Sequence, residues 1–229
     1  MQHFFIRKRD VSAATISVTA RSNNTANQTT YTFSDQATGA ANSGKVSLLG
    51  VSARAGFVGV FDISSATING SAASPLIKSV DPNSDNLCAI YGIEDPSGTD
   101  IDFSVTFTGD AARATLITAA TIGANFASLL TASDADGDTV GDATQTPNIN
   151  TFDDGVVFGI AQAATSATLN ISFTGLTDDT QQSNEALRTM AATAEVATGE
   201  TPRTISVLFD TGVADLVLAP TSCVVSFST

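Results

Sequence analysis

The sequence is poor in the residue types that most often carry catalysis. Its 229 residues include no Trp, two Cys, two Tyr and a single histidine, His3. Because His3 stands far in sequence from any serine that could act as a nucleophile, a Ser-His-acid arrangement is disfavoured. Tyr31 and Tyr91 lie in strand patterns, and the shortage of flat aromatic platforms weighs against a sugar-cleaving cleft or a sugar-stacking lectin. We therefore expect a protein that is not an enzyme.

Basic residues are also scarce, with 10 Lys and Arg against 23 Asp and Glu. The net charge of −13 disfavours a nucleic-acid partner, because phosphates repel an acidic surface. A basic cluster in residues 1–10 runs against this trend. It predicts an N-terminal arm that docks on an acidic partner through Phe4, Phe5, Arg7, Lys8 and Arg9. The alternative is a flexible terminus whose charges only aid solubility.

Long apolar runs are absent as well. None reaches the roughly 18 residues that a membrane-spanning helix needs, so we expect no membrane insertion. Residues 1–10 do not resemble a secretory signal, which predicts synthesis and assembly in a cytoplasm. Cys88 and Cys223 occupy apolar, strand-like contexts, where buried free thiols are favoured over a disulfide. Without nearby histidines these cysteines predict no zinc site.

Alternating patterns dominate what the sequence does contain. From Ile101 to Phe107, apolar residues alternate with Asp, Ser and Thr, as in a strand with one buried face. Gly109 and Asp110 are turn residues, and Ala114–Ile122 is predicted to return as the partner strand. Hydrophobic residues make up 42% of the chain, enough for a buried core. The sequence thus predicts an all-β, jelly-roll-like antiparallel β-sandwich.

The domain organisation follows from the length and from a weak repeat. After the arm, residues 11–229 are predicted to form a single β-sandwich domain. A segment at 103–114 is similar to one at 205–216. This similarity leaves open two similar, interleaved halves at about 11–122 and 150–229, which would suit a jelly roll.

Three local patterns add detail to this fold. Asn69–Gly70 is a strong hairpin signal. Phe126–Leu130 is predicted as a short helical turn. Arg188–Val196 is compatible with a helix or a strand. We favour the strand, because residues 199–202 can then form a hairpin into Thr204–Phe209.

An Asp-rich segment between residues 131 and 153 is the sharpest candidate for ion binding. Carboxylates at positions 1, 3, 5 and 9 of a loop can converge on a hard cation. The predicted calcium ligands are Asp134, Asp136, Asp138 and Asp142. Thr139 and Gln145 stand where a twelve-residue calcium loop needs a glycine and a bidentate acid. The alternative is therefore a solvated acidic loop, and no other cofactor is expected.

Two pairs of adjacent carboxylates are the remaining candidates for chemistry. Asp153 with Asp154, or Asp178 with Asp179, would suit a small glycoside hydrolase if two carboxylates lined one cleft at a suitable separation. This possibility is kept as a third class of function.

A set of strand-like runs occurs in a characteristic order between residues 29 and 180. The runs are Tyr31-Thr-Phe-Ser, Ala66-Thr-Ile-Asn-Gly-Ser-Ala-Ala, Asn86-Leu-Cys-Ala-Ile-Tyr-Gly-Ile, Phe103-Ser-Val-Thr-Phe, Gly155-Val-Val-Phe-Gly-Ile and Phe173-Thr-Gly-Leu-Thr-Asp-Asp. Together they resemble the Ser/Thr/Ala-rich β-domains of virion proteins from tailed phages and prophages. This chain departs from the family pattern at Asn69-Gly70-Ser71, where the family has a glycine pair, and in its basic arm.

The resemblance implies a non-enzymatic structural protein on the virion surface, assembled in the host cytoplasm. It also implies a homo-oligomer, with a trimer as the commonest form. We favour a head decoration (cement) or head-fibre protein that docks on the major capsid protein by its arm. The alternative is a tail-tip or tail-fibre adhesin, joined to tail proteins, that binds a host glycan through a calcium-stiffened loop.

Overall fold

The computed structural model describes residues 12–56, 61–82, 85–94, 98–135, 139–140, 142–165, 168–212 and 217–229. Every strand pairing in these residues is antiparallel, and the predicted all-β sandwich class is confirmed. The described part of the chain contains no helix long and apolar enough to cross a membrane.

The first half of the chain forms one eight-stranded sheet. Its strands are β1 (Thr15–Asn24), β2 (Gln28–Ala37), β3 (Lys45–Ala55), β4 (Ile63–Ile68), β5 (Ser71–Ala73), β6 (Pro75–Val80), β7 (Asn86–Glu94) and β8 (Asp100–Ile122). The first part of β8 pairs with β2 and β4, and its last part pairs with β1 and β3. The strand order continues from β3 to β7 and β6.

The predicted hairpin at Gly109–Asp110 is wrong, because β8 runs through this point without reversing. The register of the neighbouring strands shifts here, as β8 passes from β2 and β4 to β1 and β3. Thr29 Oγ1 donates to Asp110 Oδ1 (2.6 Å), and Gly56 N donates to the Asp110 carbonyl oxygen (2.9 Å). These two contacts hold the chain extended at Gly109 and Asp110. The two residues therefore mark the point where β8 changes its strand partners, and not a turn. The hairpin at Asn69–Gly70, between β4 and β5, is confirmed, with positive φ at both residues.

The second half forms a six-stranded sheet, a three-stranded sheet and a two-stranded ladder. Its strands are β9 (Asn125–Ala135), β10 (Thr139–Val140), β11 (Ala143–Gln145), β12 (Gly155–Ala164), β13 (Asn170–Thr174), β14 (Thr177–Asp178), β15 (Gln182–Asn184), β16 (Leu187–Val196), β17 (Ser206–Asp210), β18 (Val217–Leu218) and β19 (Thr221–Ser228). The six-stranded sheet has the order β14-β16-β12-β19-β9, with β15 also on β16, and the three-stranded sheet has the order β11-β17-β13. Among the described strands, each pairs only within its own half of the chain.

Two local predictions in this half are corrected. Phe126–Leu130 is part of β9, not a helical turn, because β9 pairs with β19 and the Phe126 ring stacks on Phe227 at 5.9 Å. Arg188–Val196 is a strand as predicted, but no hairpin joins it to β17. Residues 197–205 instead carry the chain from the six-stranded to the three-stranded sheet. Two hydrogen bonds hold them there. The N–H of Gly199 donates to Asp153 Oδ1 (2.7 Å), and the N–H of Thr151 donates to the carbonyl oxygen of Glu200 (2.9 Å).

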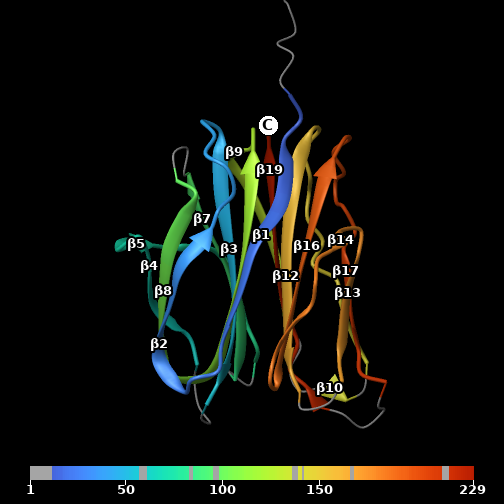
Figure 1. Ribbon diagram of the computed structural model, residues 1–229. Coiled ribbons are helices and arrows are strands. Elements are labelled where there is room, and N and C mark those ends of the chain that lie inside the picture. The colour runs from blue at the N-terminus through green and yellow to red at the C-terminus, as the bar shows by residue number, and fades with distance from the viewer. Residues whose placement is uncertain are drawn as a thin grey trace, which may run out of the picture.

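Three apolar clusters lie between the layers. The first is enclosed by the eight-stranded sheet, which brings β2, β4 and the start of β8 over β3 and β7. The second lies between the six-stranded and three-stranded sheets. The third joins the two halves face to face, between β3, β7 and β8 on one side and β12 and β19 on the other. Figure 1 shows the two halves side by side, with their strands roughly parallel to the long axis.

The strands between clusters are buried on both faces, and their sequences reflect this position. In β7, Leu87, Ala89 and Tyr91 belong to the first cluster, whereas Cys88 and Ile90 belong to the third. The strands β3, β12 and β19 follow the same rule and are buried almost throughout. Such strands read as continuous runs of apolar and small residues because neither face meets water.

Candidate functional site

The two ends of the described chain lie at the same end of the molecule. In Figure 1 the start of β1 and the C-terminus are both at the top. The register places Thr15 of β1, Ile122 of β8 and Lys45 of β3 side by side there. We call this end the terminal face. The described chain begins there, at Ser12.

Ala14 fixes the start of the described chain to both halves of the molecule. Its side chain is buried, and its N–H donates to the carbonyl oxygen of Asp154 in the second half (2.9 Å). Two positions on, the N–H of Ile16 donates to Glu195 Oε1 (3.3 Å). On the other side, Ala14 packs against Gly123 of the first half, where an added Cβ would lie 3.7 Å from the Ala14 Cα. The chain is therefore anchored between the halves as it enters β1.

The Asp154–Gly155 turn builds the second-half side of this anchor. Asp154 adopts a positive φ of 56°, and the N–H of Gly155 donates to the Phe152 carbonyl (3.2 Å). A Cβ at Gly155 would stand 2.4 Å from the Phe227 carbonyl oxygen. Only glycine allows β12 to begin this close to β19, which sets the carbonyl of Asp154 in place for Ala14.

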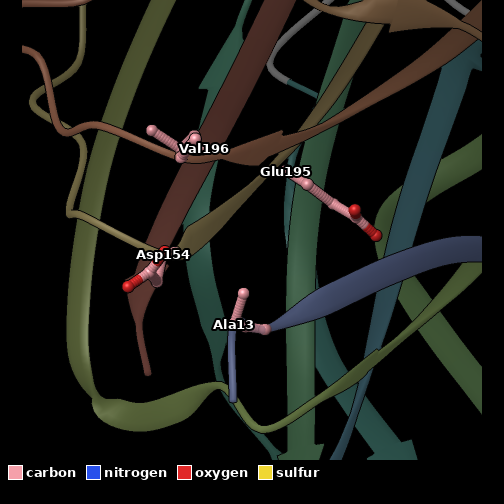
Figure 2. Close-up of a pocket in the computed structure, with 7 residues that line it drawn as sticks. Ala13, Asp154, Glu195 and Val196 are labelled. Atoms are coloured by element: carbon pink, nitrogen blue, oxygen red, sulfur yellow. The ribbon is translucent and has the colours of Figure 1, made fainter. Parts of the chain in front are cut away.

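A shallow hollow of about 290 Å³ opens beside this anchor. Figure 2 shows the Glu195 side chain directed toward β1 and the Asp154 carboxylate directed away from it. Both residues line the hollow, but their carboxylates do not converge on one point. Its lining residues are Ala13, Ala14, Asp154, Gly155, Glu195, Val196 and Ala197.

The predicted docking residues of the arm fall outside the described residues. These are Phe4, Phe5, Arg7, Lys8 and Arg9. The structure describes the chain from Ser12, so it locates the place where the arm joins the fold. Nothing in the sequence indicated that place, because Ala14, Asp154 and Glu195 are far apart in the chain and match no motif.

The predicted calcium ligands are only partly within the described residues. Asp136 and Asp138 lie outside them. Asp134 accepts from Thr146 N through Oδ2 (3.0 Å), and Asp142 accepts from Thr211 N through Oδ1 (2.9 Å). In the described ranges no group of three or more His, Cys, Asp or Glu side chains is placed to hold a metal. Calcium binding stays a prediction, and the two described carboxylates have a structural role in any case.

The carboxylate pairs considered for glycoside hydrolysis have separate partners. Asp153 accepts from Gly199 N, as described above. Asp178 accepts from Phe173 N (2.8 Å), and burial raises the pKa of its carboxyl group, an effect that this hydrogen bond partly opposes. Its neighbour Asp179 forms a bidentate ion pair with Arg21 of β1. The Asp178 and Asp179 contacts hold strands and loops together, and the Arg21 pair joins the two halves.

Cys88 and Cys223 are free and fully buried, so the prediction of buried free thiols is confirmed. What the sequence did not indicate is that the two sulfur atoms are neighbours, 3.2 Å apart.

Comparisons with known proteins identify no family. No family model matches the chain, and no curated protein matches it. Among solved structures, the chain is similar to the PBSX exported protein XepA, at 8% identity and a TM-score of 0.25, over 92% of this chain and 86% of that one. It is also similar to a chain of the Sputnik virophage, at 8% identity and a TM-score of 0.23, over 100% of this chain and 88% of that one.

A further similarity is to the N-terminal CBM22-1–CBM22-2 tandem domain of Xyn10C from Paenibacillus barcinonensis. It has 10% identity and a TM-score of 0.23, over 94% of this chain and 91% of that one. TM-scores this low carry no argument about function.

Proposed function

We propose that this protein is a non-enzymatic structural protein on the surface of a tailed-phage virion, docked there by its N-terminal arm. Within that role we favour a head decoration (cement) or head-fibre protein that binds the major capsid protein. The starting point is the resemblance of its ordered strand runs to virion β-domains. The all-β body, built from three buried apolar clusters, fits a role in which rigidity and solubility are the required properties.

The observation that carries the docking proposal is the anchor at Ala14. A docking arm transmits force to its body only if the chain is fixed where the arm ends. Ala14 is held by Asp154 of the second half and packs against Gly123 of the first. A force applied to residues 1–10 would therefore be transmitted to both halves, and it would not detach β1 from either half.

Charge distribution supports the arm as the part that meets an acidic partner. Four basic side chains of the body, those of Arg21, Lys78, Arg113 and Arg203, are each paired with a carboxylate. These pairs neutralise the cations locally and leave the body acidic, in line with the net charge of −13. Arg7, Lys8 and Arg9 lie together in the ten residues before the fold. An acidic shell would repel the body and attract this segment, which orients the protein on its partner.

The test is incorporation into particles. We expect the triple variant Arg7→Gln, Lys8→Gln, Arg9→Gln to fold normally but to lose at least about tenfold in incorporation, since each tenfold corresponds to about 1.4 kcal/mol of docking free energy. Incorporation is measured as the mass-spectrometric ratio of this protein to the major capsid protein in purified particles. Circular dichroism and thermal unfolding check that the variant is folded. Deleting residues 1–10 should have the same effect.

A matched control changes the net charge by the same amount elsewhere. The variant Ser71→Glu, Ala72→Glu, Ser74→Glu also adds three units of negative charge, at exposed positions beside the Asn69–Gly70 turn. Strand β5, which contains two of them, lies away from the terminal face (Figure 1). This control should be incorporated like the wild type. Equal incorporation of the arm variant and the wild type would contradict the docking proposal.

The partner is identified on the particle itself. Cross-linking within intact particles, followed by mass spectrometry, should join residues of the arm to the major capsid protein. Cross-links to tail proteins instead would reject the head location. Light scattering of the purified protein tests the expected homo-oligomer, for which we propose a trimer.

A further inference from the structure

The two cysteines of the chain meet across the junction of its two halves. Cys88 lies on β7 of the eight-stranded sheet, and Cys223 lies on β19 of the six-stranded sheet. They are separated by 135 residues in the sequence, yet their Sγ atoms are 3.2 Å apart. Both side chains are fully buried and belong to the third apolar cluster.

We propose that Cys88 and Cys223 are a site of intramolecular disulfide formation. A small peroxide acts as the oxidant, and the resulting disulfide covalently joins the two halves of the protein. A disulfide has an S–S distance of about 2.05 Å, so the sulfur atoms must approach by about 1 Å. The Cys223 thiol donates toward the Cys88 carbonyl oxygen (3.4 Å), and the Cys88 thiol donates toward the Cys223 sulfur. The two side chains therefore already face each other.

The two thiols are buried, but each lies on the strand next to an edge strand of its sheet. Cys88 pairs with Ser79 of β6, and Cys223 pairs with Ser133 of β9. Both β6 and β9 are the last strands of their sheets among the described residues. The hydroxyl of Ser79 donates to the carbonyl oxygen of Asp134 (2.8 Å) and so links these two edge strands. Opening this edge would admit a molecule the size of hydrogen peroxide, without global unfolding.

The reaction balances with hydrogen peroxide as the oxidant. One thiol loses its proton, the resulting thiolate attacks a peroxide oxygen, and the O–O bond breaks. A sulfenic acid forms, and the hydroxide that leaves takes up the thiol proton to give the first water. The sulfur of the second cysteine then attacks the sulfenic sulfur, the S–O bond breaks, and the second water leaves with the thiol proton. Overall, two thiols lose two hydrogen atoms, one S–S bond forms, and the peroxide is reduced to two waters.

Burial sets the rate of this reaction. It raises the pKa of the Cys223 thiol well above its ordinary value, and the neighbouring Cys88 adds to the effect. The reactive thiolate is therefore scarce near neutral pH, and the pair stays reduced under mild conditions. Raising the pH should accelerate cross-linking, because more thiolate is present each time the edge opens.

The cross-link would constrain the unfolded chain strongly. Joining residues so far apart in sequence removes much conformational entropy from the unfolded state, more than a short loop would. We expect the oxidised protein to have a Tm about 5–10 °C higher than the reduced protein. Addition of a phosphine reductant to the oxidised protein, in denaturant before refolding, should return the Tm to its original value.

The experiment treats the purified full-length chain with hydrogen peroxide at neutral and alkaline pH. The product is then unfolded in guanidinium with iodoacetamide and weighed by mass spectrometry. We expect a monomer that is two hydrogen masses lighter and takes up no carbamidomethyl group, with Cys88 and Cys223 joined in one cross-linked peptide. Its formation should be faster at alkaline pH.

Matched controls are Cys88→Ala and Cys223→Ala, each of which leaves one thiol and should show neither the mass loss nor the Tm increase. If a variant does not fold, the oxidised and re-reduced wild-type protein serve as the comparison. Two alkylatable thiols after treatment, sulfinic or sulfonic acids, disulfide-linked dimers, or a Tm that fails to rise would each overturn the proposal. The outcome concerns only the two thiols and leaves the docking of the arm to its own test.

Discussion

Tyr31 and Tyr91 are the largest fully buried side chains among the described residues. The Tyr31 hydroxyl donates to the carbonyl oxygen of Ala111 (2.6 Å), whereas that of Tyr91 has no hydrogen-bond partner in the described chain. Burial raises the pKa of Tyr31 to about 12. Burial, together with the negative charge of Asp62, raises the pKa of Tyr91 even further. Both phenols therefore stay neutral at pH values where an exposed tyrosine has already ionised.

This burial predicts an alkaline limit to stability. An unfolded tyrosine ionises near pH 10, so above that pH the unfolded state binds fewer protons than the folded state. The tyrosine contribution to stability is fully present below pH 10 and is lost as the pH rises toward the folded pKa of about 12 for Tyr31. Because the chain has two Tyr and no Trp, absorbance at 295 nm reports these two groups alone. We expect no phenolate signal near pH 10, and a steep signal near or above pH 12 that coincides with unfolding.

Single substitutions assign this signal. Tyr31→Phe and Tyr91→Phe should each remove half of the absorbance change. Tyr91→Phe should leave the unfolding free energy unchanged or slightly higher, because it removes a buried hydroxyl without a described partner. Tyr31→Phe should cost about 1–2 kcal/mol, because it deprives a buried carbonyl of its donor. A reversible titration near pH 10 in the folded protein would contradict the assignment.

At the scale of the element, the strands that separate two clusters have little room for change. Gly50 of β3 faces the six-stranded sheet, and a Cβ there would lie 2.8 Å from Ile160 Cδ1 and 3.3 Å from the Phe158 ring. The glycine thus allows β3 and β12 to approach closely. We expect Gly50→Val to lower the unfolding free energy by about 1–3 kcal/mol, because the two sheets must separate or adopt strained rotamers. Urea unfolding monitored by circular dichroism measures this loss.

The control places the same side chain on an exposed position of an edge strand. Ala127 of β9 is exposed, and Ala127→Val should change the unfolding free energy by less than about 0.5 kcal/mol. If Gly50→Val were as stable as this control, the two sheets would not be in the close contact described for them.

At the scale of the molecule, the two halves share one continuous interior. The third apolar cluster lies between them, and buried polar contacts cross the same junction. Ser52 Oγ and Thr189 Oγ1 are 2.6 Å apart, and Asn184 Nδ2 donates to the carbonyl oxygen of Ala114 (2.8 Å). Separating the halves would expose all of these groups at once. Neither half is therefore expected to remain folded when the other unfolds.

This coupling predicts one calorimetric transition. Phe103 belongs to the first cluster only and Phe173 to the second only. Replacement of either by Ala should cost about 3–5 kcal/mol and lower the same single Tm by roughly 10 °C. Scanning calorimetry of the two variants checks this. Two separate peaks, of which each variant shifts only one, would show that the halves unfold independently.

The sequence by itself determined the fold class. Alternation of apolar and polar residues is a local signal, because side chains of a strand point to opposite faces every second residue. It was sufficient for the all-β sandwich class. The Asn69–Gly70 hairpin followed from its turn residues, and the strand at Leu187–Val196 was predicted correctly although the hairpin that favoured it does not form. The burial of both cysteines followed equally from their apolar neighbours.

Only the tertiary structure decided which strands meet. The continuous course of β8 through Gly109 and Asp110, the inclusion of Phe126 in β9, and the absence of a hairpin after β16 all depend on strand partners distant in sequence. The same holds for the anchor at Ala14 and the contact of Cys88 with Cys223. A two-residue alternation shows that one face of a strand will be buried. Which other strands cover that face depends on the free energy of packing the whole chain. The packing of the whole chain thus places the two thiols, and the anchor at Ala14 where the arm joins the fold, at the junction of the halves.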